Sequence, residues 1–232
     1  MTQNSSSIQL KIIPVTPLQQ NCSMLWDADT MEGVFVDPGG EPEKLMKEAE
    51  NHGVTIKELW LTHGHLDHAG GAEDLRKTIG AKVIGPHKED LFWLEQIEAS
   101  WAKYGMSGMG KDVIPDRYLE DGDELRLGQT VFKVLHTPGH TPGHVIIYNA
   151  DLKIAFVGDV LFRGSIGRTD FPRGDHATLI KSIQTKLWPL GADMRFIPGH
   201  GPASTFGQER ADNPFVGDRV IGGSAPNTTG VM

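Results

Sequence analysis

The feature that most constrains the fold of this chain is a cluster of three histidines and one aspartate within six positions, directly after a short apolar segment. That segment, residues 58–61, is predicted to be a strand, and the cluster after it consists of His63, His65, Asp67 and His68. Multiplying residue frequencies gives this pattern about once in a thousand chains of such composition. A helix is predicted at 71–79, so the cluster occupies a loop at the carboxyl end of a strand. Sheets combined with helices usually hold their sites at such strand ends.

The residue types in the cluster favour a metal site. The first two histidines can point the same way while the aspartate and the last histidine turn toward an adjacent point, so the loop can serve two neighbouring cations. Imidazole and carboxylate ligands suit zinc, iron or manganese. The single cysteine, Cys22, can form neither an internal disulfide nor a thiolate zinc site. We therefore expect an open, catalytic metal site rather than histidines that hydrogen-bond on a polar surface.

Further candidate ligands stand at other predicted strand ends, each beside glycine or proline, which allow tight backbone turns near a metal. They are His140, Asp159 and His200. The chain also shows a faint internal repeat, because 34–39 resembles 155–159 and 60–65 resembles 195–200. Each half would supply apolar strands that end in an acid or a histidine. This predicts two similar sheet units facing each other, with polar strand ends at one rim.

Length and composition favour one large domain. The chain has 232 residues, of which 38% are hydrophobic and 22% charged, as is usual for a globular protein with one well-buried core. We predict a single domain at 8–215 and flexible tails at 1–7 and 222–232. Further strands are predicted at 8–15, 22–27, 33–36, 82–84, 124–127, 130–135, 144–148, 153–157 and 194–197, and further helices at 41–51, 89–104 and 176–187. The glycine- and methionine-rich loop 105–111 is a candidate lid over the site.

Charge and hydropathy exclude two classes of partner. Lysine and arginine are scattered and the net charge is -8, so the chain offers no basic surface for nucleic acid. No apolar run approaches the roughly 20 residues of a membrane helix. Residues 1–7 lack the basic and hydrophobic regions of a secretory signal. We expect a cytoplasmic protein with neither nucleic-acid nor membrane partners.

Taken in order, the candidate ligands resemble those of the metallo-β-lactamase superfamily, and the resemblance extends from residue 8 to about residue 215. More narrowly, segments 36–40, 62–71, 138–144, 158–162 and 164–175 resemble the short, single-domain glyoxalase II-like hydrolases of bacteria, the YcbL type. The resemblance implies an α+β fold, a four-layer αββα sandwich with two divalent metals at one edge of the paired sheets. Zinc is the first expectation, with iron or manganese as alternatives.

The resemblance also assigns roles to individual residues. One metal is held by His63, His65 and His140, the other by Asp67, His68 and His200, and Asp159 bridges them. Asp37 is expected to fix the orientation of a ligating histidine. His144 is expected to be a structural neighbour, and surface or packing roles are left for His52, His87, His136 and His176.

The chemistry implied is hydrolysis. Two ions sharing a water lower its pKa, so that hydroxide near neutral pH can attack a polarised carbonyl, and Asp67 is expected to orient this nucleophile as a catalytic residue. A thioester suits the site because its thiolate leaving group needs little protonation, and the resemblance points to S-lactoylglutathione or another glutathione conjugate. Arg168 either binds a substrate carboxylate or forms an ion pair with Asp170 or Asp175.

Two other functions remain open. Relatives that act as mononuclear-iron persulfide dioxygenases share the histidine and aspartate motif. A metal-binding protein without hydrolase activity is the third hypothesis. The larger glyoxalase II enzymes hold glutathione with a helical carboxyl-terminal domain, whereas only about thirty residues follow His200 here. Substrate would therefore have to be held differently.

Overall fold

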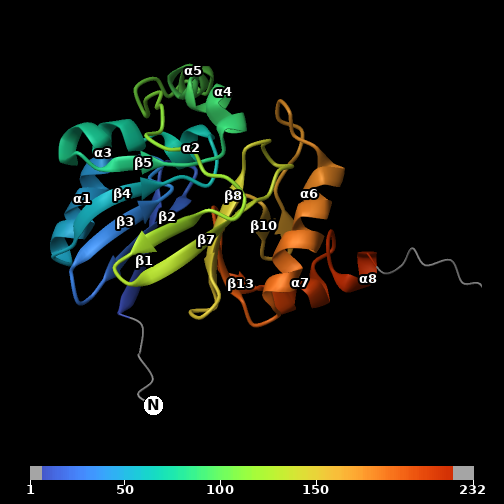
Figure 1. Cartoon of the computed structure of the whole chain (residues 1–232). Helices are drawn as coiled ribbons and strands as arrows, with labels where there is room; N and C mark the ends of the chain where they lie inside the picture. Colours follow the sequence, from blue (N-terminus) through green and yellow to red (C-terminus); the bar gives the residue numbers. More distant parts are fainter. Residues whose placement is uncertain (1–6, 222–232) are drawn as a thin grey trace, which may run out of the picture.

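The computed structural model describes residues 7–221, which form two facing sheets with helices on the outer face of each (Figure 1). The predicted four-layer αββα sandwich is confirmed. The tails predicted at 1–7 and 222–232 lie outside the described residues except for Ser7, whose carbonyl accepts a hydrogen bond from the Ala28 amide at 2.9 Å. Within residues 7–221, no helix combines the length and apolar character that a membrane crossing needs.

The first sheet mixes antiparallel and parallel pairing. Its strands, in spatial order, are β1 (Ile8–Val15), β2 (Gln20–Asp27), β3 (Glu32–Val36), β4 (Thr55–Trp60) and β5 (Lys82–Ile84). The first three pair antiparallel, whereas β4 and β5 continue the sheet parallel to β3. Parallel neighbours need crossover connections. These are supplied by α1 (Pro42–Asn51), α2 (Leu66–Ala69) and α3 (Ala72–Ile79).

The second sheet contains one parallel pair, between β12 and β9, among antiparallel neighbours. Its strands, in spatial order, are β13 (Ser204–Thr205), β12 (Arg195–Pro198), β9 (Ile154–Gly158), β8 (Val145–Asn149), β7 (Thr130–His136) and β6 (Glu124–Leu127). The crossover from β9 to β12 includes a small hairpin and a helix, namely β10 (Leu161–Phe162), β11 (Ser165–Ile166) and α6 (His176–Ser182). The described chain ends with α7 (Phe206–Asp212) and α8 (Asp218–Ile221).

Alternation of side chains along each strand divides the apolar residues into three clusters. In β3, Val34 and Val36 face the second sheet, whereas Phe35 packs with the residues of the outer helices. In β9, Phe156 faces the first sheet and Val157 packs in the cluster beneath α6. A strand that is covered on both faces therefore reads as a continuous apolar run. The central cluster joins the two sheets, and one outer cluster attaches each helical layer.

The internal repeat corresponds to equivalent pairs of strands. In the first sheet β3 and β4 are parallel neighbours, and in the second β9 and β12 are. Asp37 and His63 follow the first pair, whereas Asp159 and His200 follow the second. The polar ends of both pairs reach the same rim, as the repeat predicted.

The single helix predicted at 89–104 is wrong. The segment instead contains a 3-10 turn (Lys88–Asp90), α4 (Leu91–Leu94) and α5 (Ile97–Lys103). Two side-chain hydrogen bonds stabilise the break. The side-chain amide of Gln96 donates to the Phe92 carbonyl at 2.7 Å. At the start of α5, the backbone amide of Glu98 donates to the Asp112 carboxylate at 2.9 Å. Both bonds satisfy backbone groups at helix ends, and apolar periodicity alone does not reveal them.

Two other segments differ less. The helix predicted at 176–187 is present, but its last part, Ile183–Leu187, is a π-turn that continues α6. Helix α7 was not predicted, although its start carries a readable signal. The Thr205 hydroxyl accepts a hydrogen bond from the Gln208 amide at 3.2 Å, and threonine followed three residues later by glutamine is typical of a helix start.

Candidate metal centre

Five chain segments meet at one edge of the sandwich. The loop after β4 carries the dense motif, and Asp37 follows β3 beside it. Asp159 and His200 come from the ends of β9 and β12, while His140 lies between β7 and β8. The structure therefore brings together all seven residues predicted as metal ligands, although they come from both sheets.

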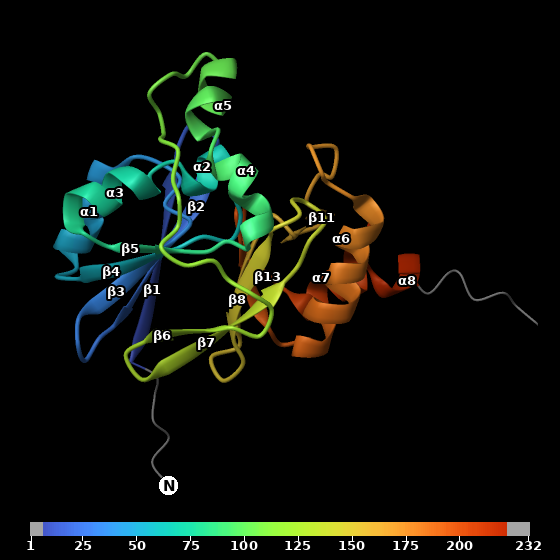
Figure 2. The same ribbon diagram turned by 45° about the horizontal axis from the view of Figure 1, so that its top comes forward.

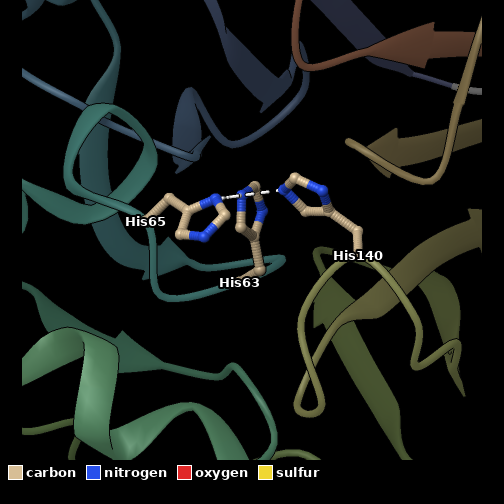
Figure 3. A group of neighbouring side chains, drawn as sticks. All are labelled: His63, His65 and His140. Carbon is tan, nitrogen blue, oxygen red and sulfur yellow. Dashed lines mark hydrogen bonds between the residues drawn. The ribbon is translucent and has the colours of Figure 1, made fainter. Parts of the chain in front are cut away.

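The first group, here called the first triad, consists of His63, His65 and His140 (Figure 3). The His65 Nδ1 atom lies 3.1 Å from His63 Nε2 and 3.0 Å from His140 Nε2. All three side chains are buried, and burial lowers the pKa of each, with neighbouring imidazoles adding to the shift. Neutral imidazoles with converging lone pairs are the form that binds a metal.

The second triad consists of Asp67, His68 and His200. The Asp67 Oδ2 atom is 3.1 Å from His200 Nε2 and 3.9 Å from His68 Nε2. Asp159 lies between the two triads. One of its carboxylate oxygens is 3.4 Å from His68 Nε2, and the other is 3.7 Å from His140 Nε2. Its carboxylate therefore faces both triads.

The charges of the second triad attract a cation. Burial opposes a proton on His68, but the carboxylates of Asp159 and Asp67 outweigh it and raise its pKa to about 9. Burial would raise the pKa of Asp67, but His68 and His200 hold it below its usual range. His68 Nε2 and Asp159 Oδ1 are buried, point toward each other and have no hydrogen-bond partner. The donor set and these unpaired atoms fit divalent metal ions.

Most imidazoles of the two triads are oriented by a hydrogen bond at their far nitrogen, an arrangement that is usual at metal sites. The pairs are His63 Nδ1 with Thr62 Oγ1 at 3.1 Å, His68 Nδ1 with Asp37 Oδ2 at 3.0 Å, His140 Nδ1 with the Arg168 carbonyl at 2.8 Å and His200 Nδ1 with the Leu18 carbonyl at 3.1 Å. His65 is the exception. Its Nε2 atom is buried without a partner, and its ring is held edge-on by Trp93 and Phe171.

Asp37 occupies a strained but well-supported position. Its backbone has a φ of 52°, which is uncommon for a residue with a side chain. The Thr62 amide donates to its Oδ1 at 2.7 Å and the Thr62 hydroxyl to its Oδ2 at 2.6 Å. Two residues later, a Cβ atom at Gly39 would lie 1.4 Å from the Asp67 carbonyl oxygen, so only glycine allows this approach. The loop after β3 therefore supports the metal-binding loop directly.

A cleft of about 780 Å³ opens over the two triads. Its apolar lining includes Leu18, Leu66, Trp93, Phe162, Ile166 and Phe171. The elements that carry much of this lining, α4 and α5 on one side and β11 on the other, can be followed in Figure 2. No residue of the candidate lid 105–111 lines the cleft. The Lys111 amide of this loop donates a hydrogen bond to the carbonyl of Gly70, the residue directly after α2.

Arg168 lines the cleft and also forms one of the ion pairs considered from the sequence. Its guanidinium donates two hydrogen bonds of 2.6 Å to the Asp170 carboxylate and lies 4.2 Å above the Phe171 ring. Asp175 is used elsewhere, because it caps α6 by accepting from the Thr178 amide. Lys103 also lines the cleft and forms no ion pair within the described part of the chain.

The remaining histidines stand outside the triads. His144 stacks on His63 with ring centroids 4.7 Å apart, and its Nε2 accepts from the Asp159 amide at 3.1 Å. It is therefore a structural neighbour that contacts both His63 and Asp159. His87 is buried rather than exposed, and it stacks on His136 at 4.2 Å.

Sequence reasoning missed three residues that shape the site. Thr62, adjacent to the motif, links Asp37 to His63. Trp93 was overlooked because it lies outside the apolar stripe that suggested a core helix. A tryptophan off that stripe is the only feature of the sequence that could have pointed to it. Asp90 had no signal in the sequence, although its buried carboxylate contacts two ligand loops.

A four-layer sandwich with two adjoining triads of histidine and aspartate at one rim defines a class of metal-dependent hydrolytic proteins. Residues 15–200 match the family described as the metallo-beta-lactamase superfamily. The chain belongs to this superfamily.

Similar proteins cover almost the whole chain. Hydroxyacylglutathione hydrolase GloC of Haemophilus influenzae is 46% identical over 213 residues, which are 91% of this chain and all of that protein. A solved structure described as BLEG-1 B3 metallo-beta-lactamase is 38% identical with a TM-score of 0.83, over 90% of this chain and 99% of the other. TTHA1623 in a di-iron-bound form is also 38% identical, with a TM-score of 0.80, over 88% and 99%.

Proposed function

We propose that this protein is a dinuclear metal-dependent hydrolase of thioesters, with S-lactoylglutathione as its substrate. The observation that carries the proposal is the position of Asp159, whose two carboxylate oxygens approach His68 of the second triad and His140 of the first. One carboxylate that reaches both positions could contribute to holding two adjacent cations, and such a pair can activate a water. The similarity to a hydroxyacylglutathione hydrolase along that protein's full length supports the substrate class.

Two divalent ions bound to the triads would lower the pKa of a shared water and polarise the substrate carbonyl. The remaining roles in the reaction are proposed for the side chains of this protein. Asp67 stays ionised because His68 and His200 lower its pKa, so its carboxylate can only accept hydrogen bonds and is suited to orient the attacking water. A thiol leaving group has a pKa of about 8.5, so it can depart as a thiolate with little protonation by a general acid.

The cleft provides the substrate contacts. Its aromatic wall, with Trp93 and Phe171 around His65, excludes water from the reacting carbonyl. Arg168 is proposed to bind a substrate carboxylate in place of Asp170. Both partners of the present ion pair are exposed, and such a pair stabilises the fold little, so a substrate carboxylate can compete for the guanidinium. This contact would hold a carboxylate of a glutathione conjugate.

The metals are proposed to be zinc, with iron or manganese as alternatives. Ligands of imidazole and carboxylate accept all three. The solved di-iron-bound relative gives iron particular support. Elemental analysis of the purified protein decides the identity and the number of ions.

The function is tested on purified holoprotein with known metal content and a panel of compounds. Thiol release from S-lactoylglutathione is compared with that from an uncharged thioester, and hydrolysis of a lactone and a β-lactam is followed in parallel. We expect two metals per chain, preference for the glutathione thioester, and loss of turnover in Asp159→Asn. Asp193→Asn is the control, because Asp193 is exposed and pairs with Lys153 away from the cleft.

Two outcomes would replace the proposal. One iron per chain, with oxygen consumed in the presence of glutathione persulfide, would establish a dioxygenase. Two metals per chain with none of the compounds turned over would establish a metal-binding protein without hydrolase activity.

A further inference from the structure

Asp90 is a buried carboxylate outside the predicted site that contacts two of its loops. It lies at the end of the 3-10 turn before α4 and has no solvent exposure. The Gly143 amide donates to its Oδ1 at 2.6 Å, while the Gly64 amide and the Thr141 hydroxyl donate to its Oδ2 at 2.9 and 2.7 Å. Within residues 7–221, it forms no ion pair. Hydrogen bonds from these two loops therefore offset only part of the cost of burying its charge.

The donors belong to the loops that carry the first triad. Gly64 lies between two of its ligands, His63 and His65. Thr141 follows the third, His140, directly, and Gly143 comes two residues later. A separation of 26 residues from one loop and 53 from the other shows that Asp90 joins segments distant in the sequence.

Both glycines are needed for the approach of Asp90. A Cβ atom at Gly64 would lie 2.9 Å from the Asp90 carbonyl oxygen and 2.8 Å from the Trp93 Cβ. At Gly143 a Cβ would lie 2.5 Å from the Asp90 amide nitrogen and 2.7 Å from its Oδ1. These distances are too short for real side chains. Glycine at both positions thus leaves space for the close approach of Asp90 to the two loops.

His65 explains why this contact matters for metal binding. His63 and His140 have hydrogen-bond partners at their far nitrogens, whereas His65 has none. Its orientation therefore depends on ring packing and on the backbone at Gly64, which Asp90 holds. A ligand without its own orienting partner is sensitive to displacement of its backbone.

We propose that Asp90 is a positioning residue that fixes the distance between the two loops of the first triad and thereby its affinity for metal. The second triad is supported by other groups, since Asp37 orients His68 and the Leu18 carbonyl orients His200. Loss of Asp90 should therefore weaken metal binding at the first triad selectively. The inference holds whatever the substrate is.

The test measures metal affinity rather than activity. In Asp90→Asn the amide keeps one acceptor but turns an NH₂ group toward hydrogen-bond donors. Metal-free protein is titrated with zinc in the presence of a competing chelator, and the binding step lost in His140→Ala identifies the first triad. We expect that step to weaken about 10- to 100-fold in Asp90→Asn while the other step keeps its affinity. Thr141→Val, which removes one of the three hydrogen bonds, should show a smaller selective loss.

Asp27→Asn is the matched control. Asp27 is also buried and accepts backbone hydrogen bonds, from Asp29 at 2.8 Å and Thr30 at 3.4 Å. It lies at the far end of β2 from Gln20, whose side chain is 3.5 Å from His68. This substitution should lower the unfolding temperature but leave both metal-binding steps unchanged.

Two results would overturn the proposal. In one, Asp90→Asn binds both metals as the unsubstituted protein does. In the other, both steps weaken equally, which would mean that Asp90 supports the fold as a whole. If Asp90→Asn does not fold, Thr141→Val decides alone, because a selective loss at the first triad supports the proposal and any other result rejects it.

Discussion

Replacing Asp37 with asparagine is the sharpest test of how the second triad is organised. The new side chain can still accept from the Thr62 amide through its remaining oxygen. It no longer offers an acceptor to His68 Nδ1, which lies 3.0 Å from the present carboxylate. That acceptor keeps the proton on Nδ1 and leaves Nε2 free for a metal. Asp37→Asn therefore removes the preference for the metal-binding tautomer of His68.

The magnitude follows from the loss of one charge-assisted hydrogen bond to a ligating imidazole. Such changes weaken metal affinity about 10- to 100-fold, which is about 1.4–2.8 kcal/mol at about 1.4 kcal/mol per factor of ten. The first triad has no hydrogen bond to Asp37 and should lose little affinity. Its His63 contacts Asp37 only indirectly, through Thr62.

The assay is a zinc titration of metal-free protein against a chelator, with the second-triad step identified by its loss in His200→Ala. The weakened step should be that one, and turnover should recover at high zinc concentration. Thermal unfolding of the metal-free variant separates affinity from loss of fold. Wild-type affinity at the second triad, or a loss confined to the first, would show that the hydrogen bond from His68 to Asp37 does not control this position.

The other predictions concern pH, charge and a thiol. Burial raises the pKa of the Asp90 carboxyl from 3.8 to about 6. Between these two values the folded metal-free protein keeps a proton that the unfolded chain releases. The free energy of unfolding therefore falls by up to about 3 kcal/mol as the pH rises from about 4 to 6. The free energy of unfolding of Asp90→Asn minus that of wild type should therefore rise over this pH range. Denaturant unfolding measures this difference, and a difference that stays constant with pH would contradict the prediction. Asp170→Ala frees Arg168, so it should lower KM for an anionic thioester and leave KM for an uncharged one unchanged. Arg168→Ala should raise KM for the anionic thioester. Lys103→Glu, like Arg168→Ala, should raise KM for the anionic thioester, whereas a KM for the anionic thioester that stays at the wild-type value in all three variants would exclude a charge contact. Burial raises the pKa of the Cys22 thiol well above its ordinary value, so a thiol reagent should modify it only when denaturant unfolds the protein, and fast modification of the native protein would show that the first sheet opens.

That the residues of the two triads gather at one rim could be predicted because their information is local. His63, His65, Asp67 and His68 form one dense motif on a strand end, and glycine or proline marks the other candidates. The strands could be predicted for a similar reason, since apolar runs buried on both faces are long and bounded by turns. The repeat even anticipated that the ends of β3, β4, β9 and β12 share a rim.

The supporting contacts could not be predicted because they join distant segments. Asp90 resembles any helix-start aspartate until the loops at Gly64 and Gly143 are seen against it. The break at Gln96 depends on Asp112, which lies 14 residues beyond the amide that it caps. Trp93 lies edge-on to His65, so its role depends on a contact between α4 and the loop after β4. Periodicity describes one element at a time, and these features are relations between elements.

Neither sheet carries a complete triad. The loop after β4 supplies two ligands to each, and the second sheet supplies the third, His140 to one and His200 to the other. Every bound ion would therefore act as a cross-link between the two halves of the molecule. Loading with metal should make the halves harder to pull apart, so that mechanical resistance of the sandwich and readiness for catalysis rise together.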